Sequence, residues 1–355
     1  MAAAWVRTAA ADRLDVVGAF FSGSTVGADP ELELPATSDV DVVVVLQRDR
    51  VPAKPGKIEL EGILIEVTYL PYAELADPEA VAGAYVLAAS FATDTIIHDP
   101  TGALESLHQH IAADFADPRR VRRRVDAVRT KIINGLAQFN TRAPWHQQVL
   151  QWLFPSSLAT HAVLVAGLRN PTVRLRYPMA RQVLQQHGVL DDYPRLVDLI
   201  GCTQVTPQLV QQHLDALAVC FDQAAALGRT PFPFSTDITP QARPIAIDGS
   251  QALIAAGDHR EAVFWIIATF GRCQQVLAAD APAQVTTAAE PAFRAAVSDL
   301  CGMREPADLL RGAERDRDAW PAIQAVAEEI IARRTIARPH GVGASGGGAR
   351  RPNSD

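Results

Sequence analysis

One segment constrains the fold of this chain more than any other, because it joins a strongly apolar run to two acids. The run SDVDVVVVL, residues 38–46, contains five valines, and β-branched residues favour an extended strand. Asp39 and Asp41 stand at its beginning. Side chains two apart on a strand point to the same face, about 6.5 Å apart along it. Burying an unpaired carboxylate costs more than the ~2–7 kcal/mol of an uncharged polar group, so the pair predicts a bound cation.

A third carboxylate, Glu66, lies within the apolar run ILIEVTYL. If this run pairs beside the first strand, Glu66 joins Asp39 and Asp41 in a cluster whose like charges repel unless divalent metal ions neutralise them. Glu59 and Glu61 on the preceding strand are alternatives for this third position. Carboxylate oxygens suit Mg²⁺ or Mn²⁺, and two metals about 3.5–4 Å apart support in-line displacement at phosphorus. The cluster therefore predicts two Mg²⁺ ions, with Mn²⁺ as an alternative.

A Gly23-Ser24 turn follows the apolar run that precedes these acids. Glycine has no Cβ, so backbone amides and the Ser24 hydroxyl can approach a phosphate closely, and a helix after the turn would aim its positive N-terminus there. Each motif alone is common. Metals on one side and a phosphate cradle on the other predict a nucleoside triphosphate site.

These motifs, taken in order, resemble those of a known superfamily. SGST, SDVDVVVVL and LIEVTY resemble the glycine-serine, Asp-x-Asp and third-carboxylate motifs of the DNA polymerase beta-like nucleotidyltransferases. The motifs cover roughly residues 14–70. The remainder of the chain is more loosely similar to the substrate-side domain of bacterial small-molecule members, such as the aminoglycoside and lincosamide nucleotidyltransferases.

The resemblance assigns a role to each motif residue. It implies that Asp39 and Asp41 bind both metals, that Glu66 binds the catalytic metal, and that Gly23 and Ser24 hold the β- and γ-phosphates. It also implies a carboxylate on the helical domain that serves as general base toward the acceptor hydroxyl, which the sequence does not identify.

The loop between Ser24 and Asp39 departs from the pattern because it is long and acidic. It carries Asp29, Glu31 and Glu33. A solvated loop accounts for these charges, and contact with a positively charged acceptor such as an amino sugar is the alternative.

The fold class follows from a change of pattern near Pro100. Before it, short apolar runs predict a small mixed sheet, with two strands joined or bent at Gly62. After it, the periodicity is helical. We therefore expect an α+β protein. The proline-rich stretch at residues 228–244 is expected to be an ordered crossing between helices, because Phe232 and Phe234 are too apolar for a solvated tether. The predicted nucleotidyltransferase domain covers residues 1–100, and the predicted all-helical domain covers residues 101–336. The crossing at residues 228–244 lies within the helical domain, and a disordered Gly-rich tail is predicted at residues 337–355.

Within the helical domain, the predicted helices cover residues 102–115, 118–140, 145–169, 176–188, 192–200, 206–228, 250–279 and 316–335.

Charge is unevenly distributed along the chain. Residues 1–100 hold 6 Lys+Arg against 16 Asp+Glu, whereas the rest holds 27 against 24. The segment 118–142 has eight basic residues and one acid, which a solvated helix face explains. Lys131 and Asn134 on this helix are candidates for triphosphate contact from the second domain. The net charge of -7 argues against a nucleic-acid partner, which needs a wide basic surface.

Several residues of the helical domain have two interpretations. Arg169, Arg174 and Arg176 follow an apolar helix, where cations stabilise the helix end, and binding of a phosphate or an acidic acceptor is the alternative. His161 is expected to be a core histidine. The aromatic residues Trp145, Trp152 and Phe154 are expected in the core, with an aromatic wall for a ligand as the alternative.

Cysteine usage and hydropathy predict a cytoplasmic protein. The four cysteines are widely spaced, which is typical of reduced, buried thiols rather than a disulfide scaffold. Arg7, Asp12 and Arg13 interrupt the Ala-rich N-terminus before a signal-peptide core can form. The apolar run EAVFWIIATFG is shorter than the ~20 residues that span a bilayer, so no membrane segment is expected.

The expected function is metal-dependent transfer of a nucleoside monophosphate from an NTP to a hydroxyl of a small molecule, with release of pyrophosphate. The acceptor would be an antibiotic or a secondary metabolite. Two alternatives remain open. One is an enzyme that modifies a protein or a tRNA end, and the other is a non-catalytic, nucleotide-binding or antitoxin-like scaffold.

Overall fold

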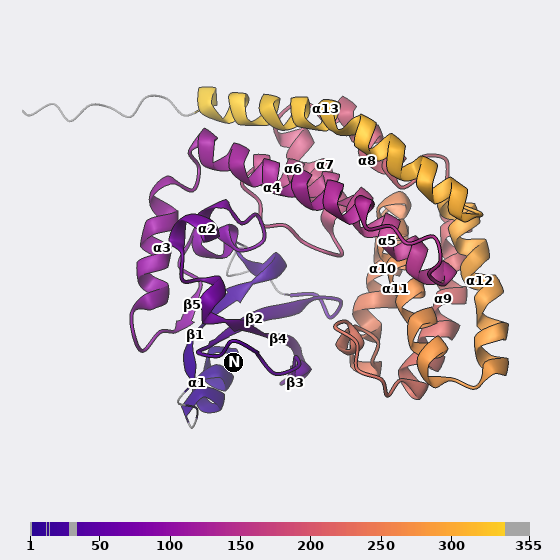
Figure 1. Ribbon diagram of the computed structural model, residues 1–355, viewed down its shortest axis with the longest axis horizontal. Helices are drawn as coiled ribbons and strands as arrows, with labels where there is room; N and C mark the ends of the chain where they lie inside the picture. Colours follow the sequence, from indigo (N-terminus) through magenta and orange to yellow (C-terminus); the bar gives the residue numbers. More distant parts are fainter. Residues whose placement is uncertain (1, 12, 14, 28–33, 338–355) are drawn as a thin grey trace, which may run out of the picture.

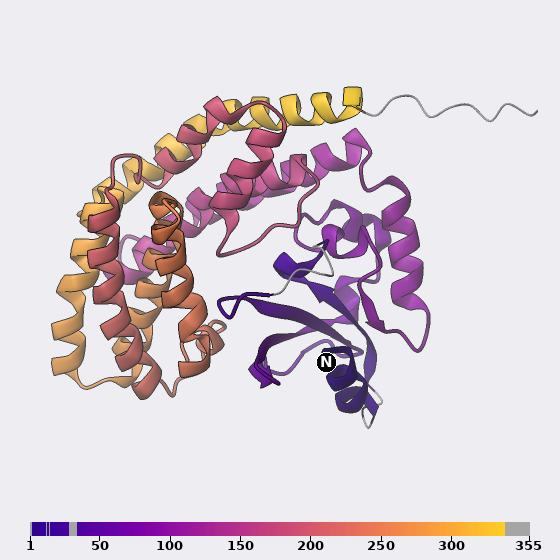
Figure 2. The ribbon, with the colours of Figure 1, turned by 180° about the vertical axis from the view of Figure 1, so that it is seen from behind.

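The computed structural model describes residues 2–11, 13, 15–27 and 34–337 and has two parts (Figure 1). A sheet forms the centre of the N-terminal part, and helices form the rest. The helical part is an arc with the sheet on its concave side, as both views show (Figures 1 and 2). The fold is thus α+β, as predicted. The predicted tail, apart from Ala337, lies outside the described residues.

Five strands form one mixed sheet. In spatial order they are β3 (Gly56–Leu60), β4 (Ile63–Pro71), β2 (Asp39–Leu46), β1 (Val16–Ser22) and β5 (Ile96–His98). The pair β2 and β4 is parallel, and the other three pairs are antiparallel. The segment with Gly62 proves to be a hairpin, since Glu61 and Gly62 both have positive φ, 50° and 81°.

Helices cover both faces of the sheet. Helix α1 (Ala2–Ala11) buries Val6 against one face, and α3 (Ala103–Asp114) buries Leu104 beside Phe20 on the other. The N-terminal core thus includes α3, so a boundary after residue 100 would separate this helix from the sheet that it covers. A fragment ending there would expose the apolar face of β1.

The helical part has one continuous core. Helix α11 packs against α5, α9, α10 and α12, and the apolar content of α11 suits this central position. All four cysteines are buried and free, as predicted. The helices of this part are α4 (Pro118–Ala137), α5 (Trp145–Ser157), α6 (Ala159–Ala166), α7 (Arg176–Gln186), α8 (Tyr193–Leu199), α9 (Pro207–Leu227), α10 (Gly249–Ala255), α11 (His259–Asp280), α12 (Ala283–Cys301) and α13 (Pro306–Ala337).

Four helical predictions differ from the structure. The helix expected over 316–335 is α13, which begins ten residues earlier, at Pro306. The helix expected over 145–169 is two helices, α5 and α6, which meet at Leu158, three residues after a proline whose missing N–H weakens the helix there. Gly257, with φ 85°, separates α10 from α11. Helix α12 was not predicted, because its internal Pro291 resembles a helix-ending signal.

The proline-rich crossing is ordered, as predicted. Phe232 and Phe234 stack with their centroids 5.2 Å apart and 4° between their planes. Both rings pack against the helical core. The crossing thereby stays close to α11, and part of it faces the sheet.

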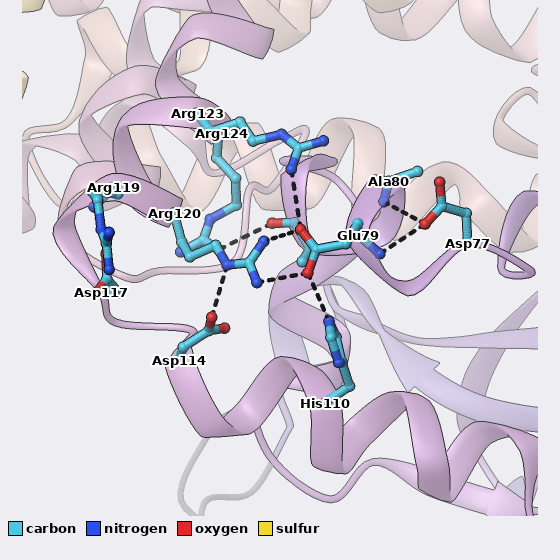
Figure 3. A network of polar contacts seen from close by, with 11 residues as sticks. Asp77, Glu79, Ala80, His110, Asp114, Asp117, Arg119, Arg120, Arg123 and Arg124 are labelled. Carbon is cyan, nitrogen blue, oxygen red and sulfur yellow. Dashed lines mark hydrogen bonds and ion pairs between the residues drawn. The ribbon is translucent and has the colours of Figure 1, made fainter.

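The basic segment at the start of α4 serves to join the two parts of the fold (Figure 3). Glu79, on α2 (Pro78–Gly83), accepts hydrogen bonds from Arg120 and Arg123 of α4 and contacts His110 of α3. The buried Arg124 donates to the carbonyl of Ala82 at 3.2 Å. Exposed pairs of this kind contribute little singly, but the network accounts for much of the positive charge that the sequence concentrates here.

Two segments, Trp145–Ala166 and His259–Asp280, are long and apolar enough by composition to cross a membrane. In each, 78% of the most apolar window is buried inside the protein. This burial is consistent with core helices of a soluble protein.

Asp316 on α13 is a buried acid that makes the stability of the fold depend on pH. It is 5% exposed, both its oxygens lack a hydrogen-bond partner among the described residues, and Arg315 reaches it only at 4.0 Å, from Nε to Oδ1. Burial raises the pKa of Asp316 to about 7 from 3.8. The folded state therefore holds the proton longer than the unfolded state does, and the free energy of unfolding falls as the pH rises from about 4 to about 7, by up to about 4 kcal/mol.

We accordingly expect Asp316→Asn to flatten this pH dependence. Thermal unfolding at about pH 5 and about pH 8 should show a smaller loss of stability in the variant than in the wild type. An equal loss in both proteins would mean that Asp316 is ionised at no cost in the fold.

Candidate functional site

A cleft of about 530 Å³ lies between the sheet and the helical part. The sheet contributes the end of β1, the first half of β2, Lys57 of β3 and the middle of β4. The helical part contributes the loop 170–175, the segment 233–246 and two side chains of α11. Both parts of the chain are thus needed to form it.

Three acids predicted from the sequence meet in this cleft. Asp39, Asp41 and Glu66 each offer a carboxylate oxygen, and these oxygens lie within 4.8 Å of one another. The parallel pairing of β2 and β4 produces the cluster, because it sets Asp41 directly opposite Glu66. The alternatives Glu59 and Glu61 are exposed and do not line the cleft.

The electrostatics of the cluster call for positive charge. Burial, followed by the charges of Asp39 and Glu66, raises the pKa of Asp41 to about 7. An all-oxygen, multiply acidic donor set is the kind that Mg²⁺ and Mn²⁺ prefer. The residues present therefore fit a divalent metal.

Glycine is the only residue type that fits at position 23. Its φ is 71°, and a Cβ there would lie 1.6 Å from Oδ2 of Asp41. The glycine thus lets the turn lie directly on the carboxylate cluster. Asn170 holds the turn from the helical side by donating a hydrogen bond to the Gly23 carbonyl. Ser24 also lines the cleft.

One element of the phosphate-cradle prediction is wrong. The turn leads into a single 3₁₀ turn, Gly23–Thr25, rather than into a helix whose N-terminus could face a phosphate. The donors that the turn offers are backbone amides and the Ser24 hydroxyl.

Two lysines, Lys57 of β3 and Lys54 just before that strand, partly neutralise the acids. Lys57 of β3 contacts Asp39, lies 2.6 Å from Glu66 Oε2 and has a side chain only 5% exposed. Lys54 donates to Glu66 Oε1 at 3.0 Å. Burial alone would lower the pKa of Lys57, but Glu66, Asp39 and Asp237 outweigh it and raise that pKa. Burial alone would raise the pKa of Glu66, but Lys57 and Lys54 outweigh burial and lower that pKa.

The helical part contributes groups that the sequence analysis missed. Asp237, in the proline-rich segment, is the one carboxylate from that part among the described residues of the cleft lining. Arg272 of α11 donates to Asp237 at 2.9 Å and lies 5.3 Å from the ring centroids of Phe154, Phe234 and Trp265. Burial raises the pKa of Asp237, although Arg272 opposes the shift. No local motif marks these residues, because 35 positions separate the two ends of the ion pair.

The three arginines after α6 have different positions. Arg174 lines the cleft and donates to the Thr37 carbonyl at 3.0 Å. Arg176 is buried, where it bonds the Val173 carbonyl at 2.8 Å and covers the Phe264 ring at 4.0 Å. Arg169 is exposed. Only Arg174 is therefore available to a ligand in the cleft.

His161 and the three aromatic residues show the expected core positions with one exception. His161 is buried, with Nε2 3.1 Å from the Thr172 carbonyl. Trp145 and Trp152 are in the core. Phe154 packs against the core but also contacts Arg272 of the cleft.

Two further candidates do not reach this site. Lys131 and Asn134 are exposed on α4 and are not among the residues that line the cleft. The acids of the long loop, Asp29, Glu31 and Glu33, lie outside the described residues.

Comparison with known proteins gave no further assignment. No protein-family model matches the chain, and no curated protein matches it.

Proposed function

We propose that the protein is a metal-dependent nucleotidyltransferase that moves a nucleoside monophosphate from an NTP to a hydroxyl of a small molecule. One observation carries the proposal. Three carboxylates from two parallel strands converge in the cleft, beside a turn that only glycine can form against them. The resemblance of these motifs to the polymerase beta-like superfamily supports the same reading.

In this proposal Asp39, Asp41 and Glu66 hold two Mg²⁺ ions, for which Mn²⁺ can substitute. Bound metals supply charge stabilisation for in-line displacement at phosphorus. The Gly23 amide and the Ser24 hydroxyl bind the β- and γ-phosphates. These chain groups orient the nucleotide, and bound metals would add positive charge to a cluster that Lys57 and Lys54 only partly neutralise.

The acceptor binds on the helical side of the cleft. Asp237 is our candidate for the general base, because it is the carboxylate that faces the metal site from that side. Burial raises the pKa of Asp237, and a higher pKa makes a carboxylate a stronger base. Trp265 and Phe234 supply flat apolar surface to the same side. A hydroxylated antibiotic or secondary metabolite fits this lining, and the site of action would be the cytoplasm.

The test is a screen of the purified protein with each NTP, Mg²⁺ and a panel of hydroxylated small molecules. Pyrophosphate release and a mass increase of the acceptor by one nucleoside monophosphate are expected. Activity should fall only moderately between about 50 and 200 mM salt, whereas a polynucleotide acceptor would lose about 10³-fold or more in affinity. If no NTP releases pyrophosphate with any acceptor, the protein is not this enzyme.

Ser24→Ala should weaken NTP binding by about 1–3 kcal/mol, because it removes one charge-assisted hydrogen bond to phosphate. The backbone donors of the turn remain, so the turnover of bound nucleotide should change less than the affinity. Isothermal titration calorimetry with a non-hydrolysable NTP measures the change. Unchanged affinity would mean that the phosphates bind elsewhere in the cleft.

A further inference from the structure

Lys57 occupies space that a metal ion bound to the same carboxylates would need. Its ammonium contacts Oδ2 of Asp39 and lies 2.6 Å from Oε2 of Glu66. Mg²⁺ binds carboxylate oxygens at about 2.0–2.1 Å, so an ion that bridges these two oxygens and the Lys57 ammonium exclude each other. The position of the lysine is built into the sheet, because Lys57 is the direct cross-strand neighbour of Glu66.

The ammonium also performs electrostatically what a metal would. Like charges that are largely buried repel strongly. Of the two lysines that contact the acids among the described residues, Lys57 is the less exposed, with 5% of its side chain accessible against 38% for Lys54. It therefore offsets part of the repulsion among the three acids.

We propose, on the basis of the proposed function, that Lys57 is a resident counter-ion that metal must displace, and that the NTP triphosphate receives the displaced ammonium. Metal alone then binds weakly, because it competes with an internal cation. Metal and nucleotide together bind tightly, because the polyanion compensates the loss of the two carboxylate partners. Occupation of the carboxylate cluster by metal in the absence of nucleotide is thereby suppressed.

The side chain has a path for this movement. Lys57 already lies 3.6 Å from Asp237 across the cleft, so its ammonium faces the volume between sheet and helices. Arg272 pairs with Asp237 at 2.9 Å, which leaves that carboxylate already partnered. A lysine ammonium on a flexible stem can reorient where an arginine fork would be fixed, and an NTP in the cleft is the partner with the most negative charge.

The experiment measures binding of Mn²⁺ alone by calorimetry and by electron paramagnetic resonance. Lys57→Met should bind Mn²⁺ at least about tenfold more tightly than the wild type, since removing a cation at contact distance is worth more than the 1.4 kcal/mol of a tenfold change. Lys54→Met is the matched control. It removes the same charge from Glu66, but from an exposed side chain screened by water, so the affinity should change less than about threefold.

A non-hydrolysable NTP supplies the second measurement. In the wild type it should raise the Mn²⁺ affinity by a larger factor than in Lys57→Met, because only the wild type has an ammonium to transfer to the triphosphate. Lys57→Gln, which keeps hydrogen-bond donors without the charge, repeats the test if Lys57→Met fails to fold.

The outcomes separate this inference from the proposed function. If the wild type binds Mn²⁺ in a manner that Asp41→Asn abolishes, but removing the Lys57 charge does not tighten binding beyond the Lys54 control, only the inference on Lys57 is wrong. If neither the wild type nor the variants bind Mn²⁺ at this cluster, with or without NTP, the metal site itself is wrong and both proposals fall.

Discussion

Replacing Asp41 with asparagine should reduce nucleotidyl transfer by at least about 10³-fold, and Asp39→Asn and Glu66→Gln should do the same. The loss exceeds the 10²–10³ typical of one electrostatic group, because each acid would hold a metal rather than a hydrogen bond. Steady-state pyrophosphate release with Mg²⁺ measures the effect. Each variant should remain folded, because each substitution keeps the shape of the side chain, and Lys57 retains one of its two cluster carboxylates in Asp39→Asn and in Glu66→Gln.

Glu59→Gln is the matched control for these three variants. Glu59 is an acid of the adjacent strand β3, but it is exposed and outside the cleft. Its activity should equal that of the wild type. Near wild-type turnover in any of the three cluster variants would place the metals elsewhere, and a loss in all four proteins would point to net charge rather than to a site.

Gly23→Ala is expected to have the second largest effect. The added Cβ would lie 1.6 Å from Asp41 Oδ2, at a φ of 71°. No side chain fits there, so Asp41 must rotate out of the cluster or the turn must move away from it. Activity should fall by about 10²-fold or more, and the left-handed backbone should cost about 1–2 kcal/mol of stability.

Gly62→Ala separates the two causes. Gly62 has a φ of 81°, similar to that of Gly23, but nothing lies within 4 Å of the Cβ that the substitution would add. This variant should lose stability by the backbone cost alone and keep its activity. Chemical denaturation and pyrophosphate release measured on both variants would test the distinction. Equal activity of Gly23→Ala and wild type would show that the contact with Asp41 has no functional role.

The cluster of acids was predictable because it depends on short-range patterns. Alternation along a strand puts Asp39 and Asp41 on one face, and an apolar run around Glu66 marks it as an acid in an interior strand. The remaining condition, that β2 and β4 pair, is a single choice of neighbour. The glycine-serine turn was recognisable for a similar reason, although the length of the element after it was not.

Long-range packing decided the rest of the site. Asp237 and Arg272 have no sequence signature, and their ion pair exists because the ordered crossing returns along α11 to face the sheet. Lys57 could not be assigned from its sequence context, because its position against Glu66 depends on the register of an edge strand. Lys131, by contrast, has a charge that would suit a triphosphate, but it is exposed on α4 and does not line the cleft. Local patterns determine which residues share a strand face, whereas the residues that meet across a cleft are selected by how distant elements pack.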